Sequence, residues 1–230
     1  MTAAAARDPA AFVRHNTALE RPTLVPEIEL RLASVLVPLW HATETELEAM
    51  GLPPPYWAFA WAGGQALARH LLDNPALVAG RSLLDFAAGS GISAIAAAKV
   101  GAGPVEACEI DPFALAAIAL NAEFNGVVVT VRGDDLIGRD DGWEVVLAGD
   151  VCYERPMADR VFVWLRDLAA RGALVLVGDP GRTYFPKAGL EKIAVYAVPT
   201  SRELEDSDLR NAGVWRVLPA AGPQAGSSIR

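Results

Sequence analysis

The chain has 230 residues, a formal net charge of −8 and a pI near 4.9. With 52% apolar residues, a chain of this length has enough material for the core of one α/β domain. The acidic balance, with no stretch rich in lysine and arginine, argues against nucleic acid as the main partner. No apolar run reaches the roughly 18 residues of a membrane span, and the N-terminal run, interrupted by Arg7, is too short for a signal peptide. We therefore expect a cytoplasmic protein.

The two cysteines, Cys108 and Cys152, are too few for a disulfide framework and have no nearby histidine that would complete a zinc site. We expect both to be buried, where cysteine behaves as a small apolar side chain. The sequence predicts no metal site.

The first 55 residues predict an N-terminal extension. Residues 1–25 carry little hydrophobic periodicity, which indicates a loosely docked arm. Ile28, Leu30 and Leu32 alternate with charged residues, which predicts a half-buried strand outside the main sheet. A capping box at residues 43–46 predicts a short helix that ends at Met50, before the three prolines at 53–55.

Residues 82–111 predict one βαβ unit. In order, they give an apolar strand ending at Asp85, a small-residue turn holding Gly89 and Gly91, a helix over 92–100, and a strand over 104–108 that leads into Glu109. Glycine permits close approach of a ligand, toward which the free N–H groups of the helix start would point. Glu109 follows Gly89 by 20 residues, the distance at which a carboxylate on the neighbouring strand can bind two ribose hydroxyls. The unit predicts a nucleoside-binding crevice.

The identity of the nucleoside depends on Asp85. Gly89, Gly91 and Ala94 also satisfy the loose dinucleotide fingerprint. A carboxylate about 4 Å from a pyrophosphate would cost roughly 1 to 4 kcal/mol, depending on the dielectric. A cationic ligand reverses the sign, and S-adenosylmethionine carries both an ammonium and a sulfonium. The residue types therefore favour S-adenosylmethionine over a nicotinamide dinucleotide.

The segment Asp85-Phe-Ala87-Ala-Gly89-Ser-Gly91 resembles motif I of class I S-adenosylmethionine-dependent methyltransferases. The resemblance implies a Rossmann-like fold and S-adenosylmethionine as cofactor, with Asp85, Ala87, Gly89, Gly91 and Glu109 in its binding site. Ala87 replaces the first glycine of the family pattern, so close backbone approach at this position stays an open question.

An aromatic segment precedes this unit. It contains Tyr56, Trp57, Phe59 and Trp61, followed by Gly63 and Gly64 and a helix over 65–72. In one interpretation the aromatic side chains fill the core. In the other, Trp61 and the two glycines flank the methionine end of the cofactor, because glycines beside an aromatic ring permit close backbone approach.

The rest of the chain continues the alternation of strands and helices. Further strands are predicted over 127–131, 143–148, 173–177, 193–198 and 214–218, with helices that begin at Pro112, where Asp111 is the cap, and at Pro156. The strands end in loops rich in acids and glycines. Together these elements predict an α/β, Rossmann-like, doubly wound sheet of seven mostly parallel strands. Residues 56–230 form one compact unit with its site at the carboxyl ends of the strands.

Acidic residues follow the third and fourth predicted strands. Asp134 lies where the methyltransferase family binds the adenine amino group, although a solvated turn is the alternative. Asp150-x-x-Tyr153 resembles the acidic-x-x-aromatic motif of seven-strand protein-lysine methyltransferases. This resemblance implies that Asp150 holds the target ammonium and that Tyr153 lines the lysine channel. The alternative is a helix cap and a core aromatic.

Residues 26–219 are similar to the electron-transfer flavoprotein beta-subunit lysine methyltransferases, in their bacterial form. The similarity is carried by Pro55-Tyr-Trp-Ala-Phe-Ala-Trp-Ala-Gly-Gly, Leu84-Asp-Phe-Ala-Ala-Gly-Ser-Gly, Gly149-Asp-Val-Cys-Tyr-Glu and Gly178-Asp-Pro-Gly-Arg. It implies methylation of lysines on the flavoprotein's beta subunit, near its partner-recognition loop. Nothing in the sequence demands a dimer, so we expect a monomer.

Three other activities stay open at this point. A small-molecule N-methyltransferase would share the cofactor site and require a closed acceptor pocket for a pyridine or an amine. An NAD-dependent dehydrogenase is disfavoured by Asp85. A non-catalytic binding domain would bind the cofactor without turnover.

Overall fold

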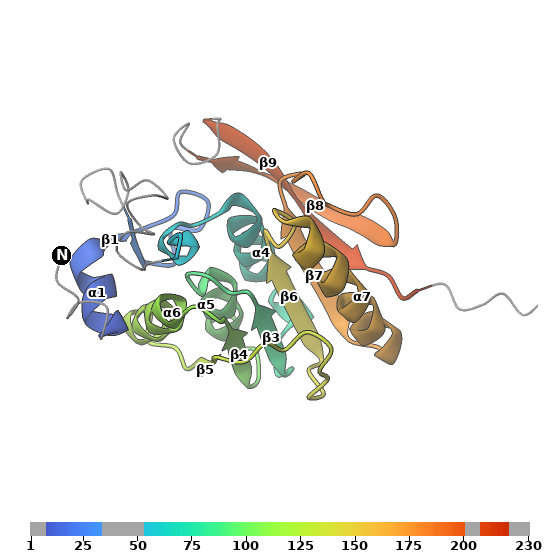
Figure 1. Ribbon diagram of the computed structural model, residues 1–230, viewed down its shortest axis with the longest axis horizontal. Helices are drawn as coiled ribbons and strands as arrows, with labels where there is room; N and C mark the ends of the chain where they lie inside the picture. The colour runs from blue at the N-terminus through green and yellow to red at the C-terminus, as the bar shows by residue number, and fades with distance from the viewer. Residues whose placement is uncertain (1–7, 34–52, 201–207, 221–230) are drawn as a thin grey trace, which may run out of the picture.

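The computed structural model describes residues 8–33, 53–200 and 208–220, and its centre is a seven-stranded sheet (Figure 1). The strand order is β5-β4-β3-β6-β7-β9-β8. The bounds are β3 (Leu83–Phe86), β4 (Val105–Cys108), β5 (Thr130–Arg132), β6 (Val145–Gly149), β7 (Leu174–Asp179), β8 (Leu190–Pro199) and β9 (Leu209–Val217). The strands from β5 to β7 pair in parallel, and β9 is antiparallel to both of its neighbours. The prediction of seven mostly parallel strands is confirmed.

Helices cover both faces of the sheet. The α-helices beside the sheet are α4 (Ala62–Asp73), α5 (Ile92–Lys99), α6 (Pro112–Phe124) and α7 (Arg155–Arg171). Two short 3-10 helices, η2 (Tyr56–Ala58) and η3 (Pro75–Leu77), also lie in this part of the chain. Leu83 and Leu147 belong to the apolar cluster shared with α4 and α5, whereas Leu84 and Val146 belong to the cluster shared with α7 (Figure 1). Because successive strand residues point to opposite faces, these continuous apolar runs fill both layers of the core.

The N-terminal residues form structure that the sequence did not predict. Helix α1 (Pro9–Asn16) is capped by Asp8 and buries Phe12 and Val13. The Phe12 ring lies 4.6 Å from that of Phe113 on α6, between centroids. Helix α1 lies beside α6 (Figure 1), so it is attached to the body of the protein. The expectation of a loose arm is wrong here, because one short helix with two buried side chains shows little periodicity.

The strand expected near Ile28 is confirmed as β2 (Leu30–Leu32). It pairs antiparallel with β1 (Ala18–Glu20) in a two-stranded sheet separate from the main one. The helix expected over residues 43–50 lies outside the described residues. Among the described residues, none of the helices combines the length and apolar character needed to cross a membrane.

Candidate active site

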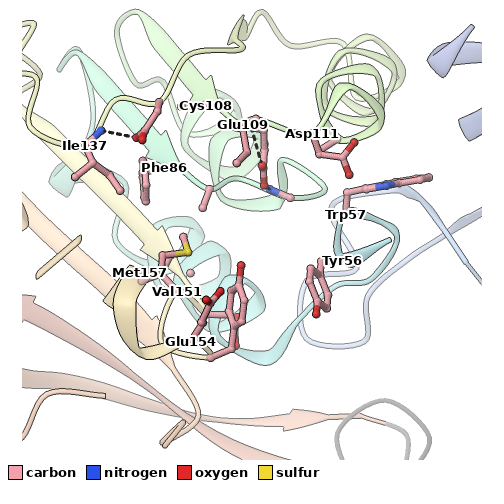
Figure 2. A pocket seen from close by; sticks show the side chains of 18 of the residues that line it. Tyr56, Trp57, Phe86, Cys108, Glu109, Asp111, Ile137, Val151, Glu154 and Met157 are labelled. Atoms are coloured by element: carbon pink, nitrogen blue, oxygen red, sulfur yellow. Dashed lines mark hydrogen bonds between the residues drawn. The ribbon is translucent and has the colours of Figure 1, made fainter. Parts of the chain in front are cut away.

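A cavity of about 630 Å³ opens at the carboxyl ends of β3, β4 and β6 (Figure 2). Its walls come from the segments that follow these strands, together with residues of η2 and α7. Strand β3 pairs with β4 on one side and with β6 on the other, so the strand order reverses here. Open α/β sheets bind their ligands at such a point, and the volume is in the range of small-molecule sites.

The turn after β3 exposes its backbone to the cavity. Ala87 and Gly89 both line it, with φ of 52° and 54°. Ala87 thus adopts a conformation that favours glycine despite its Cβ. Gly91 has a φ of 81°, caps α5 and faces Ile118; it is not among the residues that line the cavity.

Asp85 lies behind this turn and not on the cavity wall. Its side chain is 2% exposed, and its Oδ2 accepts a hydrogen bond from the Ala94 N–H in the first turn of α5 at 2.9 Å. Burial raises the pKa of this carboxyl to about 7. Asp85 therefore fixes the start of α5, and the preference for a cationic ligand that the sequence attributed to it has to come from other carboxylates.

Glu109 follows β4, lines the cavity and contacts the turn after β3. Its Oε1 accepts a hydrogen bond from the Gly89 N–H at 3.0 Å, and its Oε2 accepts one from Ile110 (Figure 2). Burial raises the pKa of this carboxyl. The side chain of Ile110, by contrast, is 74% exposed beside the cavity. Glu109 and Gly89 meet as their spacing predicted.

Asp134, after β5, lies at the rim of the cavity. Its carboxylate pairs with Arg132 at 3.4 Å and with Arg139 at 3.7 Å, and its backbone oxygen accepts a hydrogen bond from the Cys108 thiol. Both cysteines are buried, as predicted, and burial raises the pKa of Cys108 to about 12. Apolar side chains of Phe86 and Ile137 complete this part of the wall (Figure 2).

Asp150 follows β6 and lines the cavity, as does Arg182 from the loop after β7. Its Oδ1 accepts hydrogen bonds from Nη2 and Nε of Arg182 at 2.7 and 3.1 Å, and its Oδ2 accepts one from the Gly64 N–H at 2.9 Å. Burial raises the pKa of this carboxyl to about 6, while the Arg182 charge acts in the opposite direction. Asp150 has a φ of 58°. It is a buried, ion-paired carboxylate on the cavity wall.

Two tyrosines form an aromatic face on the wall of the cavity that Asp150 also lines. The rings of Tyr56 and Tyr153 lie 5.5 Å apart between centroids, and each residue is 49% exposed. Trp61 also lines the cavity, and its ring lies 5.4 Å from the Arg182 guanidinium. Trp57 is 2% exposed and packs with Phe12 and Phe113 in a small apolar cluster beside α1 and α6, so its ring belongs mainly to the core.

Gly63 and Gly64 lie in the first turn of α4, where they allow close packing. A Cβ added to Gly63 would lie 2.3 Å from the Gly178 backbone oxygen and 2.6 Å from Oδ2 of Asp150. The glycine pair therefore lets the start of α4 reach the ends of β6 and β7. Neither glycine is among the residues that line the cavity.

Similar proteins reveal the family. The chain is 41% identical over 213 residues to the electron transfer flavoprotein beta subunit lysine methyltransferase of Danio rerio, covering 89% of this chain and 81% of that protein. The Homo sapiens protein of the same name is 38% identical over 220 residues, with 91% and 82% coverage. The chain belongs to the electron transfer flavoprotein beta subunit lysine methyltransferase family. It is therefore an S-adenosylmethionine-dependent methyltransferase, and the NAD-dependent dehydrogenase is excluded.

Other comparisons match a part of the chain or its fold. Residues 66–148 match the family model described as ribosomal protein L11 methyltransferase (PrmA). The fold resembles the Pyrococcus abyssi tRNA (uracil-54, C5)-methyltransferase in complex with S-adenosyl-L-homocysteine, with a TM-score of 0.54 and 15% identity over 88% of this chain and 44% of that one. It also resembles magnesium protoporphyrin IX methyltransferase from Synechocystis with bound SAH, with a TM-score of 0.51 and 14% identity over 76% and 88% of the two chains.

The charge on the cavity wall fits the family's methyl donor. The charged residues that line it are Glu109, Asp111, Asp134, Asp135, Asp150 and Glu154 on the acidic side, and Arg160 and Arg182 on the basic side. Such a wall favours a ligand with an ammonium and a sulfonium over a pyrophosphate. The preference expected from Asp85 alone thus belongs to the whole wall.

Sequence reasoning did not assign roles to several residues of this family's cavity. Arg182 stands in the sequence only as the end of the similar segment Gly178-Asp-Pro-Gly-Arg, Tyr56 is one of several aromatic residues, and no motif assigns a role to Ile110. Ile110 directly follows Glu109 at a strand end, which was an available signal. The pairing of Arg182 with Asp150 joins residues 32 positions apart and carries no local signal.

Proposed function

We propose that this protein transfers methyl groups from S-adenosylmethionine to lysine side chains of the electron transfer flavoprotein beta subunit. One observation carries the proposal: the buried Asp150 carboxylate and the half-exposed rings of Tyr56 and Tyr153 lie on the wall of the same cavity. A carboxylate next to an aromatic face suits the recognition of an alkylammonium. Because both rings reach solvent, a side chain of a folded protein can approach them. The acceptor named for the relatives matches this chemistry.

The donor end would be held by residues around the turn after β3. Glu109 would accept hydrogen bonds from the ribose hydroxyls, and the backbone at Ala87 and Gly89 would lie against the methionine part. Ile110 and Ile137 offer apolar surfaces for the adenine ring. The Asp134 carboxylate, at the cavity rim, would accept a hydrogen bond from the adenine amino group.

The chain's own work is mainly alignment. When bound, S-adenosylmethionine supplies an electrophilic methyl group on a sulfonium. Asp150 orients the acceptor nitrogen by accepting a hydrogen bond from it, and the Tyr56 and Tyr153 rings pack along the side chain that carries this nitrogen. Holding two reactants in line removes a large part of the barrier of a bimolecular reaction. Trp61 lines the cavity, and its ring lies against the Arg182 guanidinium that pairs with Asp150.

The experiment is a transfer assay with labelled S-adenosylmethionine and purified flavoprotein beta subunit, followed by mass spectrometry of the peptides. We expect label on lysine side chains of the subunit. Cell extract serves as a second acceptor source. Label that enters only small molecules would contradict the proposal and favour a small-molecule N-methyltransferase, and donor binding without any transfer would favour a non-catalytic binding domain.

We also propose that the protein acts as a monomer in the cytoplasm. The described cysteines are buried and reduced, which suits a reducing compartment. Sedimentation at the working concentration and fractionation of cells test these two statements. A dimer that exchanges slowly, or recovery with the envelope fraction, would contradict them.

A further inference from the structure

Arg182 is fixed from three sides at the acceptor end of the cavity. Its guanidinium donates two hydrogen bonds to Oδ1 of Asp150, at 2.7 and 3.1 Å, and lies over the Trp61 ring. Its backbone N–H donates to Oδ1 of Asp179 at 2.7 Å. The side chains of Arg182 and Asp150 are 19% and 10% exposed. A charged pair with this geometry and burial holds a fixed position.

This pairing changes what an acceptor amine meets at Asp150. The carboxylate charge is already balanced by a guanidinium, which stays charged at neutral pH. A lysine with an ordinary pKa near 10.4 needs about 4 to 5 kcal/mol to expose its neutral amine at pH 7. A like charge within about 4 to 6 Å favours release of the proton from an ammonium, whereas an unpaired carboxylate would retain it.

We propose that Arg182 is a positioning residue that keeps the acceptor nitrogen in its uncharged form. It neutralises Asp150, so the carboxylate accepts a hydrogen bond from an amine N–H and does not form an ion pair with an ammonium. The ammonium releases one proton to water at the cavity mouth. The nitrogen lone pair then forms the bond to the methyl carbon as the sulfur–carbon bond breaks, and the positive charge passes from sulfur to nitrogen. This inference rests on the proposed lysine acceptor.

Other charged and titratable groups lie around this pair. They are Cys152, Tyr153 and Glu154 after β6, Asp179 after β7, Arg210 on β9, Tyr56 in η2, Glu109 after β4 and Arg160 on α7. Burial raises the pKa of the Cys152 thiol and of the Tyr153 phenol, so both stay neutral at pH 7. Arg160 pairs with Asp135 at 3.4 Å, and Arg210 lines a separate smaller hollow. Among the described residues, the cationic side chain that pairs with Asp150 is that of Arg182.

The test is the pH dependence of single-turnover methyl transfer to the flavoprotein beta subunit between pH 7 and 10, with S-adenosylmethionine saturating. Arg182→Gln should move the acidic limb of the profile upward by about one pH unit or more, which lowers the rate at pH 7 by about tenfold and restores it at high pH. Arg182→Lys, which keeps the charge, should leave the limb in place. Arg166→Gln is the matched control, because Arg166 on α7 binds the Ala188 backbone oxygen outside the cavity.

A double variant keeps the test decisive if Arg182→Gln folds poorly. Asp150→Asn with Arg182→Gln removes both charges, so the limb should return toward its wild-type position even though the rate is lower. An equal loss of rate at every pH, or a limb that does not move in Arg182→Gln, would overturn the inference. A wild-type protein that transfers no methyl to this subunit at any pH would instead contradict the proposed acceptor, and the inference would fall with it.

Discussion

The centroids of the Tyr56 and Tyr153 rings lie 5.5 Å apart with the ring planes tilted by 46°, although η2 precedes and the loop after β6 follows the βαβ unit of residues 82–111 in the sequence. Each tyrosine is half exposed, and both line the same cavity as Asp150. The two rings are more exposed than the Asp150 carboxylate, so the proposed function assigns them to contact with the acceptor side chain. Acceptor recognition is therefore expected to depend on both residues.

Replacing either tyrosine by alanine should raise KM for the protein acceptor. Loss of one cation–π contact of about 0.5 to 2 kcal/mol corresponds to roughly a 2- to 30-fold change. The Kd for S-adenosylmethionine, measured by calorimetry, should stay the same. Tyr56→Phe and Tyr153→Phe keep the rings and should change KM much less. An alanine variant with an unchanged KM would remove that ring from the acceptor site.

Glu109→Gln should weaken donor binding. The variant keeps the size of the side chain and loses the charge that would receive the ribose hydroxyls, and hydrogen bonds to charged groups are worth about 1.5 to 3 kcal/mol, or roughly 10- to 100-fold in Kd. Titration calorimetry with S-adenosylhomocysteine measures the change. Glu144→Gln is the control, because Glu144 binds Ser82 at the opposite end of β6. Equal affinity in the wild type and Glu109→Gln would refute the ribose assignment.

Much of the fold could be predicted because the strands are buried on both faces. The runs that became β6 and β7 are continuously apolar and end in glycine or an acid, and β3 starts with two leucines before Asp85; these are local signals. The insertion of β9 between β7 and β8 has no such signal, since the order of strands is set by pairing between distant segments. The same holds for the packing of α1.

Some features of the site could also be predicted from local spacing, whereas others depend on contacts between distant loops. Glu109 could be placed because its spacing from Gly89 reflects the length of one βαβ unit. Asp85 was predicted to face the ligand, but a carboxylate at the end of a strand can also turn back toward the following helix, as it does here. The Asp150–Arg182 pair depends on the juxtaposition of two loops, so periodicity and spacing could not reveal it.

Ala87→Gly should stabilise the protein by about 1 kcal/mol. Ala87 has a φ of 52°, and the left-handed region costs a residue with a Cβ about 1 to 2 kcal/mol, which exceeds the entropy gained by the unfolded chain with glycine. Urea denaturation measures the difference. Ala88→Gly, one residue on and without a positive φ, should destabilise by about 0.5 to 1 kcal/mol. If both changes destabilise equally, the strain at Ala87 is absent.

Asp85→Asn should make stability less dependent on pH. Burial raises the pKa of Asp85 from 3.8 to about 7, so the folded state binds its proton more tightly than the unfolded state does. The stability that this group contributes is complete below pH 3.8, falls as the pH rises and is gone above about 7; the shift corresponds to about 4 kcal/mol at most. Asparagine still accepts the Ala94 hydrogen bond and has no charge to bury. Urea denaturation at pH 5 and pH 8 measures how much the free energy of unfolding changes between these pH values in the wild type and in Asp85→Asn. An equal change in both proteins would contradict the raised pKa.

The most direct test of the account is Asp150→Asn, assayed in parallel for donor affinity and for single-turnover methyl transfer to the flavoprotein beta subunit. Asp150 lies on the cavity wall after β6, whereas Gly89 and Glu109, which are hydrogen-bonded to each other, follow β3 and β4. We predict that the Kd for S-adenosylhomocysteine stays within about twofold, while transfer falls by about two orders of magnitude because the acceptor nitrogen loses its alignment. Transfer at the wild-type rate would contradict the assignment of the acceptor site.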